Sequence, residues 1–297
     1  MDDEFPEPLA DNARTDPEDR SLVARAMCGE QVGLEELVRR HQRWIYNVAI
    51  RMLHHPQDAE DATQEILLKA LTRLSSFEDR SSFRTWLYRI VVNHVLNMKR
   101  GRMETATVTF RSFGDALDAT PDRDFPEPTA ATADERLLVT DAMVSCTSGM
   151  LLCLDREQRL SYILGEILGV SDTVAAELLE ISRDNFRQRL ARARKDLHNF
   201  MNDKCGLVNS ANPCRCAKKT RGFIEAGHVD PKNLLFARDH VQQVRKVVPK
   251  AFKALSTVDD ECARVYREHP FHETRDLVPM LRGLLERPEF RKATGLS

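Results

Sequence analysis

The sequence predicts an all-α protein built from two compact domains. Apolar residues recur at spacings of three and four along most of the chain, which is typical of amphipathic helices. Aromatic residues make up 6% of the chain, and it holds 12 glycines and 13 prolines, a composition that disfavours a β-sandwich. The 297 residues, 42% of them apolar, are enough for two hydrophobic cores.

Charge and segment composition narrow the class of protein further. The 44 basic and 46 acidic side chains leave a formal charge of −2, so any nucleic-acid binding has to come from local basic faces. The first 20 residues carry eight acids and two arginines and lack the basic start and apolar core of a signal peptide. No apolar run approaches the ~20 residues that span a bilayer. We therefore expect a cytoplasmic protein without membrane insertion.

The residue pattern divides the chain into six segments. Leu34, Leu37 and Val38 begin a helical repeat that Pro56 interrupts. Residues 103–133 are rich in Thr, Ala, Asp and Pro and show little periodicity, which is typical of a linker. The predicted segments are an acidic flexible tail (1–20), a helical domain (21–102), the linker (103–133), a second helical domain (134–204), a cysteine-rich knuckle (205–232) and a helical C-terminal extension (233–297).

Residues 80–102 have the composition of a surface that binds melted DNA. They include six Lys and Arg residues and no acid, with Phe83, Trp86 and Tyr88 between them. Basic side chains hold phosphates, and an aromatic face that stacks on an unpaired base contributes roughly 1–3 kcal/mol. A core helix with a solvated basic face is the alternative, and it accounts well for Trp86 and its apolar neighbours.

Residues 172–197 have the pattern of a helix-turn-helix. A short helix (173–179) and a turn precede a longer basic helix, for which Ser182 has the side chain of an N-cap. Phe186 and Leu190 lie on the face that would pack against the first helix, and the arginines lie on the remaining face. The second helix of such a unit enters the DNA major groove. An ordinary charged surface helix explains the same pattern and stays open as the alternative.

A third segment, between Asp58 and Glu65, contains four acids and no base. Acids at the start of a helix complement the helix dipole. The same acids would also form a docking face for a protein partner. The residues alone leave both explanations open.

These three segments, taken in order, resemble a known family. An acidic-start helix (DAEDATQEILLKAL), a basic aromatic helix (FRTWLYRIVVNHVLNMKR), a linker and a helix-turn-helix ending in RLARARKDL follow one another. This order resembles the bacterial RNA polymerase sigma factors of the extracytoplasmic-function (ECF) group, over about residues 21–204. The resemblance implies two helical domains, sigma regions two and four. It also implies a protein that binds core RNA polymerase, directs it to specific promoters and helps to melt the −10 element.

The resemblance also assigns roles to individual residues. The surface that docks on core polymerase would contain Asp58, Asp61, Gln64 and Glu65. The −10 element would be opened and read by Phe83, Arg84, Trp86, Tyr88, Arg89, Asn93, Lys99 and Arg100. The −35 element would be read by Arg183, Arg187, Gln188, Arg189 and Arg192. Glu180 stands in the turn where family members usually carry a glycine, so this residue has to adopt an unusual backbone conformation.

The cysteines form a separate feature. Their odd number, seven, argues against a disulfide framework. Cys205, Cys214 and Cys216 lie within twelve residues and are followed by His228, and three thiolates with one imidazole complete a tetrahedral zinc site. Reduced structural cysteines and a redox-responsive pair of thiols are the alternatives, and the residues leave all three open.

Two other classes of function compete with the sigma factor. A stand-alone helix-turn-helix regulator would not bind core polymerase, whereas the linker between two DNA-facing segments and the acidic helix favour the sigma factor. A zinc enzyme would need a catalytic motif such as HExxH, which the sequence lacks. We therefore expect a protein that is not an enzyme, requires no cofactor and has core polymerase and promoter DNA as partners. An anti-sigma factor is a further partner in the family, and residues 233–297 form the alternative regulator, acting in cis.

Overall fold

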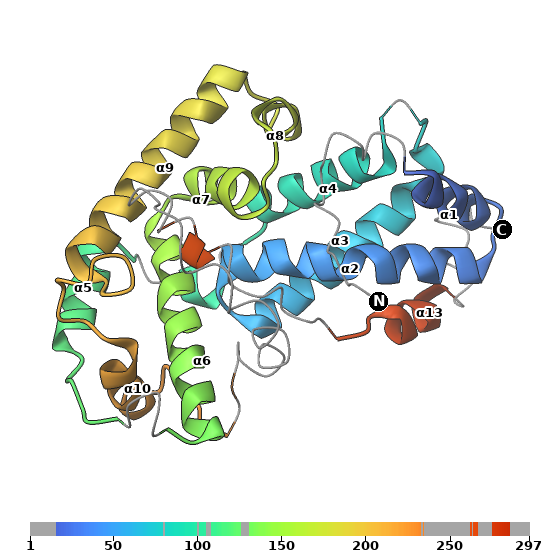
Figure 1. The fold of residues 1–297 in the computed structure, drawn as a ribbon. Coiled ribbons are helices and arrows are strands. Elements are labelled where there is room, and N and C mark those ends of the chain that lie inside the picture. The colour runs from blue at the N-terminus through green and yellow to red at the C-terminus, as the bar shows by residue number, and fades with distance from the viewer. Residues whose placement is uncertain are drawn as a thin grey trace. The chain divides into compact units, whose positions relative to one another are not determined.

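The computed structural model describes residues 16–79, 81–99, 101–104, 108–125, 131–232, 234, 262, 264–266 and 275–285 (Figure 1). Within these ranges the regular structure is helical and no strand occurs, which confirms the predicted all-α class. The chain forms two compact units. The first contains Met1–Gly101, Ile163–Gln188 and Glu273–Ser297, and the second contains Arg102–Tyr162 and Arg189–His272.

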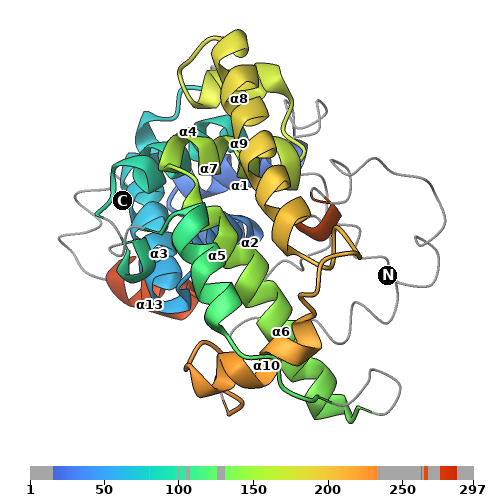
Figure 2. The same ribbon diagram turned by 90° about the vertical axis from the view of Figure 1, so that its left-hand side faces the viewer.

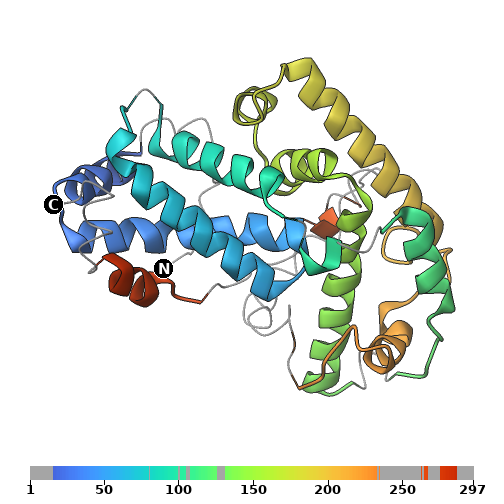
Figure 3. The ribbon, with the colours of Figure 1, turned by 180° about the vertical axis from the view of Figure 1, so that it is seen from behind.

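Four helices form the bundle of the first unit: α1 (Pro17–Met27), α2 (Gln31–Leu53), α3 (Pro56–Arg73) and α4 (Phe83–Asn97) (Figure 3). Proline at the first position and a polar cap begin both α1 and α3, with Asp16 and His55 as the capping residues. The core side chains at most 1% exposed include Ile45, Met52, Ile66, Leu87, Val91 and Val95. Because α1 begins at Pro17, the predicted acidic tail is shorter than expected, and residues 1–15 lie outside the described ranges.

The first helix, the turn and the first residues of the second helix of a helix-turn-helix belong to the first unit. Helix α8 (Asp172–Leu178) is followed by a turn and by α9 (Arg183–Lys204), as the sequence predicts. The Ser182 hydroxyl accepts a hydrogen bond from the Asn185 amide at 3.2 Å, which is the expected N-cap. Ala175 of α8 and Phe186 of α9 are both at most 1% exposed. The small side chain of Ala175 leaves room for the Phe186 ring.

The end of the C-terminal extension packs against α2. Helix α13 (Val278–Leu285) buries Leu277, Val278 and Leu281, each at most 6% exposed. The Leu277 amide donates to Gln42 Oε1 at 3.1 Å in a buried hydrogen bond. Arg282 donates to both carboxylate oxygens of Glu35 at 2.7 Å. This helix therefore belongs to the same unit as the N-terminal bundle.

The second unit contains α5 (Phe110–Ala119), α6 (Ala133–Met150), α7 (Arg156–Tyr162), the larger part of α9 and α10 (Cys216–Glu225) (Figure 2). Helix α5 corrects the prediction of an irregular linker over residues 103–133. It begins with a capping box formed by Thr109 and Ser112, and Phe110 packs on Phe200 of α9 with ring centroids 5.3 Å apart. The sequence analysis missed it because the helix is only ten residues long and is followed by prolines.

A buried ion-pair network joins α7 to the chain before α5. Arg159, 4% exposed, donates to Glu104 Oε1 at 2.7 Å and to the carbonyls of Leu151 and Leu154. Arg156 donates to the other Glu104 oxygen at 2.6 Å. The guanidinium of Arg159 thereby satisfies carbonyl groups that the end of α6 and its final 3-10 turn would leave without partners.

Helix α10 makes the predicted knuckle a part of the second unit. It packs along α6, and Lys219 Nζ donates to the Thr120 carbonyl at 2.5 Å. A Cβ atom on Gly222 would come within 2.5 Å of the Thr120 side chain, so only glycine permits this approach.

One helical stretch, Ala133–Cys153, is long and apolar enough to cross a membrane by length and composition. Half of its most apolar window is buried inside the protein. Core helices of soluble proteins pass the same test, so this stretch does not by itself indicate a membrane protein.

Candidate functional site

The outward face of α4 carries three of the residues predicted to read the −10 element. Trp86, Arg89 and Asn93 recur at spacings of three and four, with Asn93 exposed and the other two half-buried. The Trp86 ring lies against Phe77, with centroids 5.6 Å apart, and Arg89 donates to Glu177 of α8 at 2.6 Å. Lys99 is exposed beyond the end of α4, and Arg100 lies outside the described residues.

Three other residues of that set lie inside the bundle. Phe83 is 6% exposed, and Tyr88, 1% exposed, stacks on Trp44 with centroids 3.7 Å apart. Burial raises the pKa of Tyr88 far above its ordinary value, so the phenol stays neutral. Arg84 is 8% exposed and is held by two aspartates. The prediction that these side chains face DNA is therefore not supported, because the broad apolar face of α4 turns them into the core.

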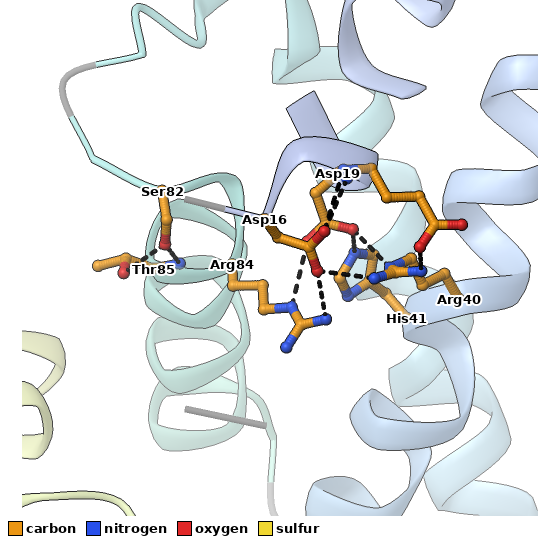
Figure 4. A network of polar contacts seen from close by, with 8 residues as sticks. Asp16, Asp19, Arg40, His41, Ser82, Arg84 and Thr85 are labelled. Carbon is orange, nitrogen blue, oxygen red and sulfur yellow. Dashed lines mark hydrogen bonds and ion pairs between the residues drawn. The ribbon is translucent and has the colours of Figure 1, made fainter. Parts of the chain in front are cut away.

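The partners of Arg84 form a polar network between α1, α2 and α4 (Figure 4). Asp16 caps α1 and accepts from Arg84 at 2.9 Å and from Arg40 at 2.6 Å. Asp19, 2% exposed, accepts from Arg84 Nε at 3.1 Å and pairs with Arg40 Nε at 2.7 Å. His41 Nε2 lies 3.1 Å from Asp19 Oδ1, the oxygen that also faces Arg40 Nε. One buried carboxylate thus joins three helices.

The environment of Asp19 favours its ionised form. Burial raises the pKa of the carboxyl, but the hydrogen bond from His41 and the charges of His41, Arg84 and Arg40 act in the opposite direction and outweigh it. The pKa therefore lies below the ordinary value of 3.8. Asp19 is accordingly a structural anion that orients α4 from the inside.

The acidic-start helix α3 exposes part of the predicted polymerase-docking surface. Asp61 and Glu65, spaced one turn apart, are exposed, and Gln64 is half-buried. Asp58 differs from the prediction, because its side chain is only 14% exposed and lies 3.4 Å from the His55 ring. The outward acidic surface of α3 is therefore centred on Asp61 and Glu65.

The first turns of α9 carry the residues predicted to read the −35 element. Arg183, Arg187, Gln188 and Arg192 are exposed, while Arg189 is half-buried. The Arg189 guanidinium lies 3.0 Å from Glu157 of α7, so this residue pairs within the protein. Glu180, in the preceding turn, has a φ of 55°, the left-handed conformation expected where a glycine is usual.

His228 lies apart from the three cysteines with which it is predicted to bind zinc. Cys216 begins α10, and His228 follows the other end of that helix, exposed and with its ring against Phe223. Ten helical residues rise about 15 Å, so Cys216 and His228 do not share one tetrahedral site. Among the described residues, no group of three or more His, Cys, Asp or Glu side chains is placed to hold a metal ion.

The three cysteines belong to the second unit, where Cys205 is buried and Cys214 and Cys216 are half-buried. Burial, reinforced by the neighbouring thiols of Cys205 and Cys214, raises the pKa of Cys216 to about 12. Cys205, 5% exposed, also has a raised pKa because it is buried. A raised pKa keeps a thiol protonated at neutral pH and makes it a weaker nucleophile than an ordinary cysteine.

Known proteins match this chain in the bundle of the first unit and over about three-fifths of its length. Residues 37–105 match the sigma-70 region 2 family. The RNA polymerase sigma-H factor of Pseudomonas aeruginosa is 29% identical over 186 residues, which are 61% of this chain and 92% of that protein. RNA polymerase sigma factor NccH of Alcaligenes xylosoxydans xylosoxydans is 32% identical over 186 residues, 62% of this chain and 95% of that protein. The ECF RNA polymerase sigma-E factor of Escherichia coli K12 is 28% identical over 183 residues, 61% of this chain and 93% of that protein.

The chain belongs to the ECF-type RNA polymerase sigma factors. Sigma factors in general are not enzymes. The region 2 match of this sigma factor covers most of α2 and all of α3 and α4. The relatives are matched over nearly their whole length but account for about three-fifths of this chain, and the remainder lies outside those alignments.

Sequence reasoning missed the two aspartates that organise the bundle of this sigma factor. Asp16 and Asp19 were assigned to an acidic flexible tail on composition alone. A local signal was present, because an aspartate directly before a proline, with acids in the next turn, is typical of a helix start. Their ion-pair partners, 24 and 65 positions away, had no local signal.

Proposed function

We propose that this sigma factor binds core RNA polymerase, directs it to specific promoters and helps to open the −10 element. The observation that carries the proposal is the match to bacterial sigma factors over 92–95% of their length. A stand-alone regulator is not favoured, because those relatives are named as RNA polymerase sigma factors. The protein would act in the bacterial cytoplasm, without a cofactor of its own and without catalysis.

The exposed surfaces support a division of roles. Asp61 and Glu65 on α3 form the acidic docking surface for core polymerase. The melted −10 strand would stack on the ring of Trp86 and bond to the amide of Asn93. The cations of Arg89 and Lys99 would hold its phosphates. The N-terminal turns of α9 enter the major groove at the −35 element. An anti-sigma protein stays a predicted partner.

The test is run-off transcription with purified bacterial core polymerase on the promoter of the protein's own gene, combined with a binding assay for core polymerase. Specific transcripts from the wild-type protein support the proposal. Replacing Asp61 and Glu65 with arginine should lower core binding at least tenfold, whereas Glu36→Arg, at an exposed acid of α2, should not. Protein that is folded but neither binds core polymerase nor gives transcripts, also in its 1–204 form, would favour the stand-alone regulator.

We further propose that α13 regulates this sigma factor in cis. The supporting observation is the packing of Leu277, Val278 and Leu281 on α2, together with the ion pair between Arg282 and Glu35. The partner of α13 is the domain that carries the proposed polymerase-binding surface. Release of α13 would therefore be coupled to the use of this domain by polymerase, and the charge-reversal experiment described in the Discussion tests the coupling.

A further inference from the structure

A carboxylate and two arginines span the turn of the helix-turn-helix. Asp172, the first residue of α8, accepts hydrogen bonds from Arg187 Nε at 2.5 Å and from Arg183 Nη2 at 3.2 and 3.3 Å. The Asp172 side chain is 26% exposed, whereas those of Arg183 and Arg187 are 54% and 56% exposed. One half-buried carboxylate of the first helix therefore holds two exposed guanidinium groups of the second.

The contact with Asp172 uses only one edge of Arg187. Its Nε and Nη2 groups both face the same oxygen, Oδ2 of Asp172. A guanidinium is planar and carries five N–H donors, so the edge formed by its two terminal nitrogens keeps donors for a second planar acceptor. Guanine offers such an acceptor in the major groove, at O6 and N7.

A fixed arginine reads a base more selectively than a mobile one. A free arginine on a helix surface reaches many acceptors, including phosphates, and loses side-chain entropy when it settles on one of them. The ion pair with Asp172 removes part of this freedom before DNA binds. The carboxylate also repels a phosphate that would compete for the same guanidinium.

We propose that Asp172 is a positioning residue for recognition of the −35 element, and that it holds the Arg187 guanidinium in the orientation that reads a guanine. The proposal rests on the proposed sigma-factor function, in which the start of α9 enters the major groove. Arg183, held by the same carboxylate, contributes positive charge toward the adjacent backbone. Asp172 itself touches no base.

The experiment uses the full chain in holoenzyme with bacterial core polymerase. Duplex DNA with 30 randomised base pairs is selected by binding at one fixed salt concentration, and the selected promoter is then substituted base by base and transcribed. We expect a guanine at one upstream position. Asp172→Ala should reduce the preference for this guanine by about tenfold and leave the preferences at other positions unchanged.

Two further variants separate positioning from general electrostatics. Glu180→Ala removes an exposed acid from the turn between the two helices, and it should raise binding to all sequences without changing the preference. Arg187→Ala should abolish the guanine preference, and Asp172→Ala should have no further effect in that background. Asp172→Asn retains an acceptor oxygen without the charge and should give an intermediate preference.

The results that overturn the proposal are distinct. Unchanged base preference in folded Asp172→Ala protein, or an effect of this substitution that persists without Arg187, overturns the positioning role. So does a wild-type selection that shows no upstream guanine. Failure of the wild-type protein to bind core polymerase or to give transcripts overturns the proposed function, and the positioning role with it.

Discussion

The Asp19 carboxylate joins α1 to α2 and α4 through side chains that are themselves largely buried. Replacement by asparagine would remove the most buried counter-charge of Arg84 and Arg40 and leave the more exposed Asp16 as the acid that they share. We therefore expect Asp19→Asn to lower the free energy of unfolding by about 3 kcal/mol. The measurement is urea denaturation at pH 7, followed by circular dichroism. Glu18→Gln is the matched control, because Glu18 pairs with Arg40 at the surface and is 63% exposed.

The control should change stability by less than about 0.5 kcal/mol. Equal losses in the two variants would contradict the assignment of Asp19 as the central group of the network. Asp19→Asn and Glu18→Gln each remove one negative charge next to Arg40, and the two charges differ in how deeply they are buried.

The same carboxylate predicts how stability depends on pH. The pKa of Asp19 in the folded protein lies below 3.8, its ordinary value, because hydrogen bonds and neighbouring cations outweigh burial. The unfolded chain therefore binds the proton more readily, and the stabilisation is complete above pH 3.8 and is lost as the pH falls through the folded pKa. We expect the difference in unfolding free energy between wild type and Asp19→Asn to shrink below about pH 4. A difference that stays constant down to pH 2 would contradict this.

The turn of the helix-turn-helix depends on one left-handed residue. Glu180 adopts a φ of 55°, and a Cβ atom in this region costs about 1–2 kcal/mol, part of which glycine recovers. Glu180→Gly is therefore expected to stabilise the protein by about 0.5–1 kcal/mol. Thermal unfolding of the full chain measures the change. Glu180→Ala keeps the Cβ and loses only the charge, so it should leave the stability nearly unchanged.

Helices with a long periodic pattern of apolar residues and a capping residue at their start could be predicted from the sequence. Short helices, and helices that depend on packing against distant residues, could not. The helix-turn-helix was found because Ser182 caps α9 and Phe186 follows at the buried spacing. Helix α5 could not be predicted because its apolar face, centred on Phe110, is stabilised by packing on Phe200. Phe200 lies 90 positions away in the sequence, so no local pattern indicates this contact. The composition of α4 predicted that its aromatic rings face DNA, and this was wrong for the buried ones. The spacing of apolar residues does not show which rings of a broad face enter the core.

The candidate functional residues, like the helices, could be predicted only where the signal is local in the sequence. Exposed, acid-rich or base-rich helix faces were identified correctly as surfaces at Asp61 and at Arg187. Arg84 was assigned to DNA because its partners, Asp16 and Asp19, are distant in sequence. The role of Asp172 was hidden for a related reason: a single acid at a helix start has the same sequence pattern whether it complements the dipole or holds two arginines.

The last part of the C-terminal extension, Glu273–Ser297, belongs to the first unit. Three apolar side chains of this segment are buried, and one ion pair joins it to α2. A helix held by so few contacts exchanges between docked and released states, and a binding partner that prefers one state shifts this equilibrium.

Charge reversal at the ion pair between α13 and α2 tests whether this equilibrium controls the sigma factor. Arg282→Glu places two carboxylates opposite each other and should release α13, and Glu35→Arg should do the same from the other side. We expect each single reversal to increase core polymerase binding and transcription about threefold to tenfold, and to expose the C-terminal segment to limited proteolysis. The double reversal restores the pair and should return both measurements toward wild type. Increased proteolysis without increased transcription would show that α13 supports the bundle without restraining its function.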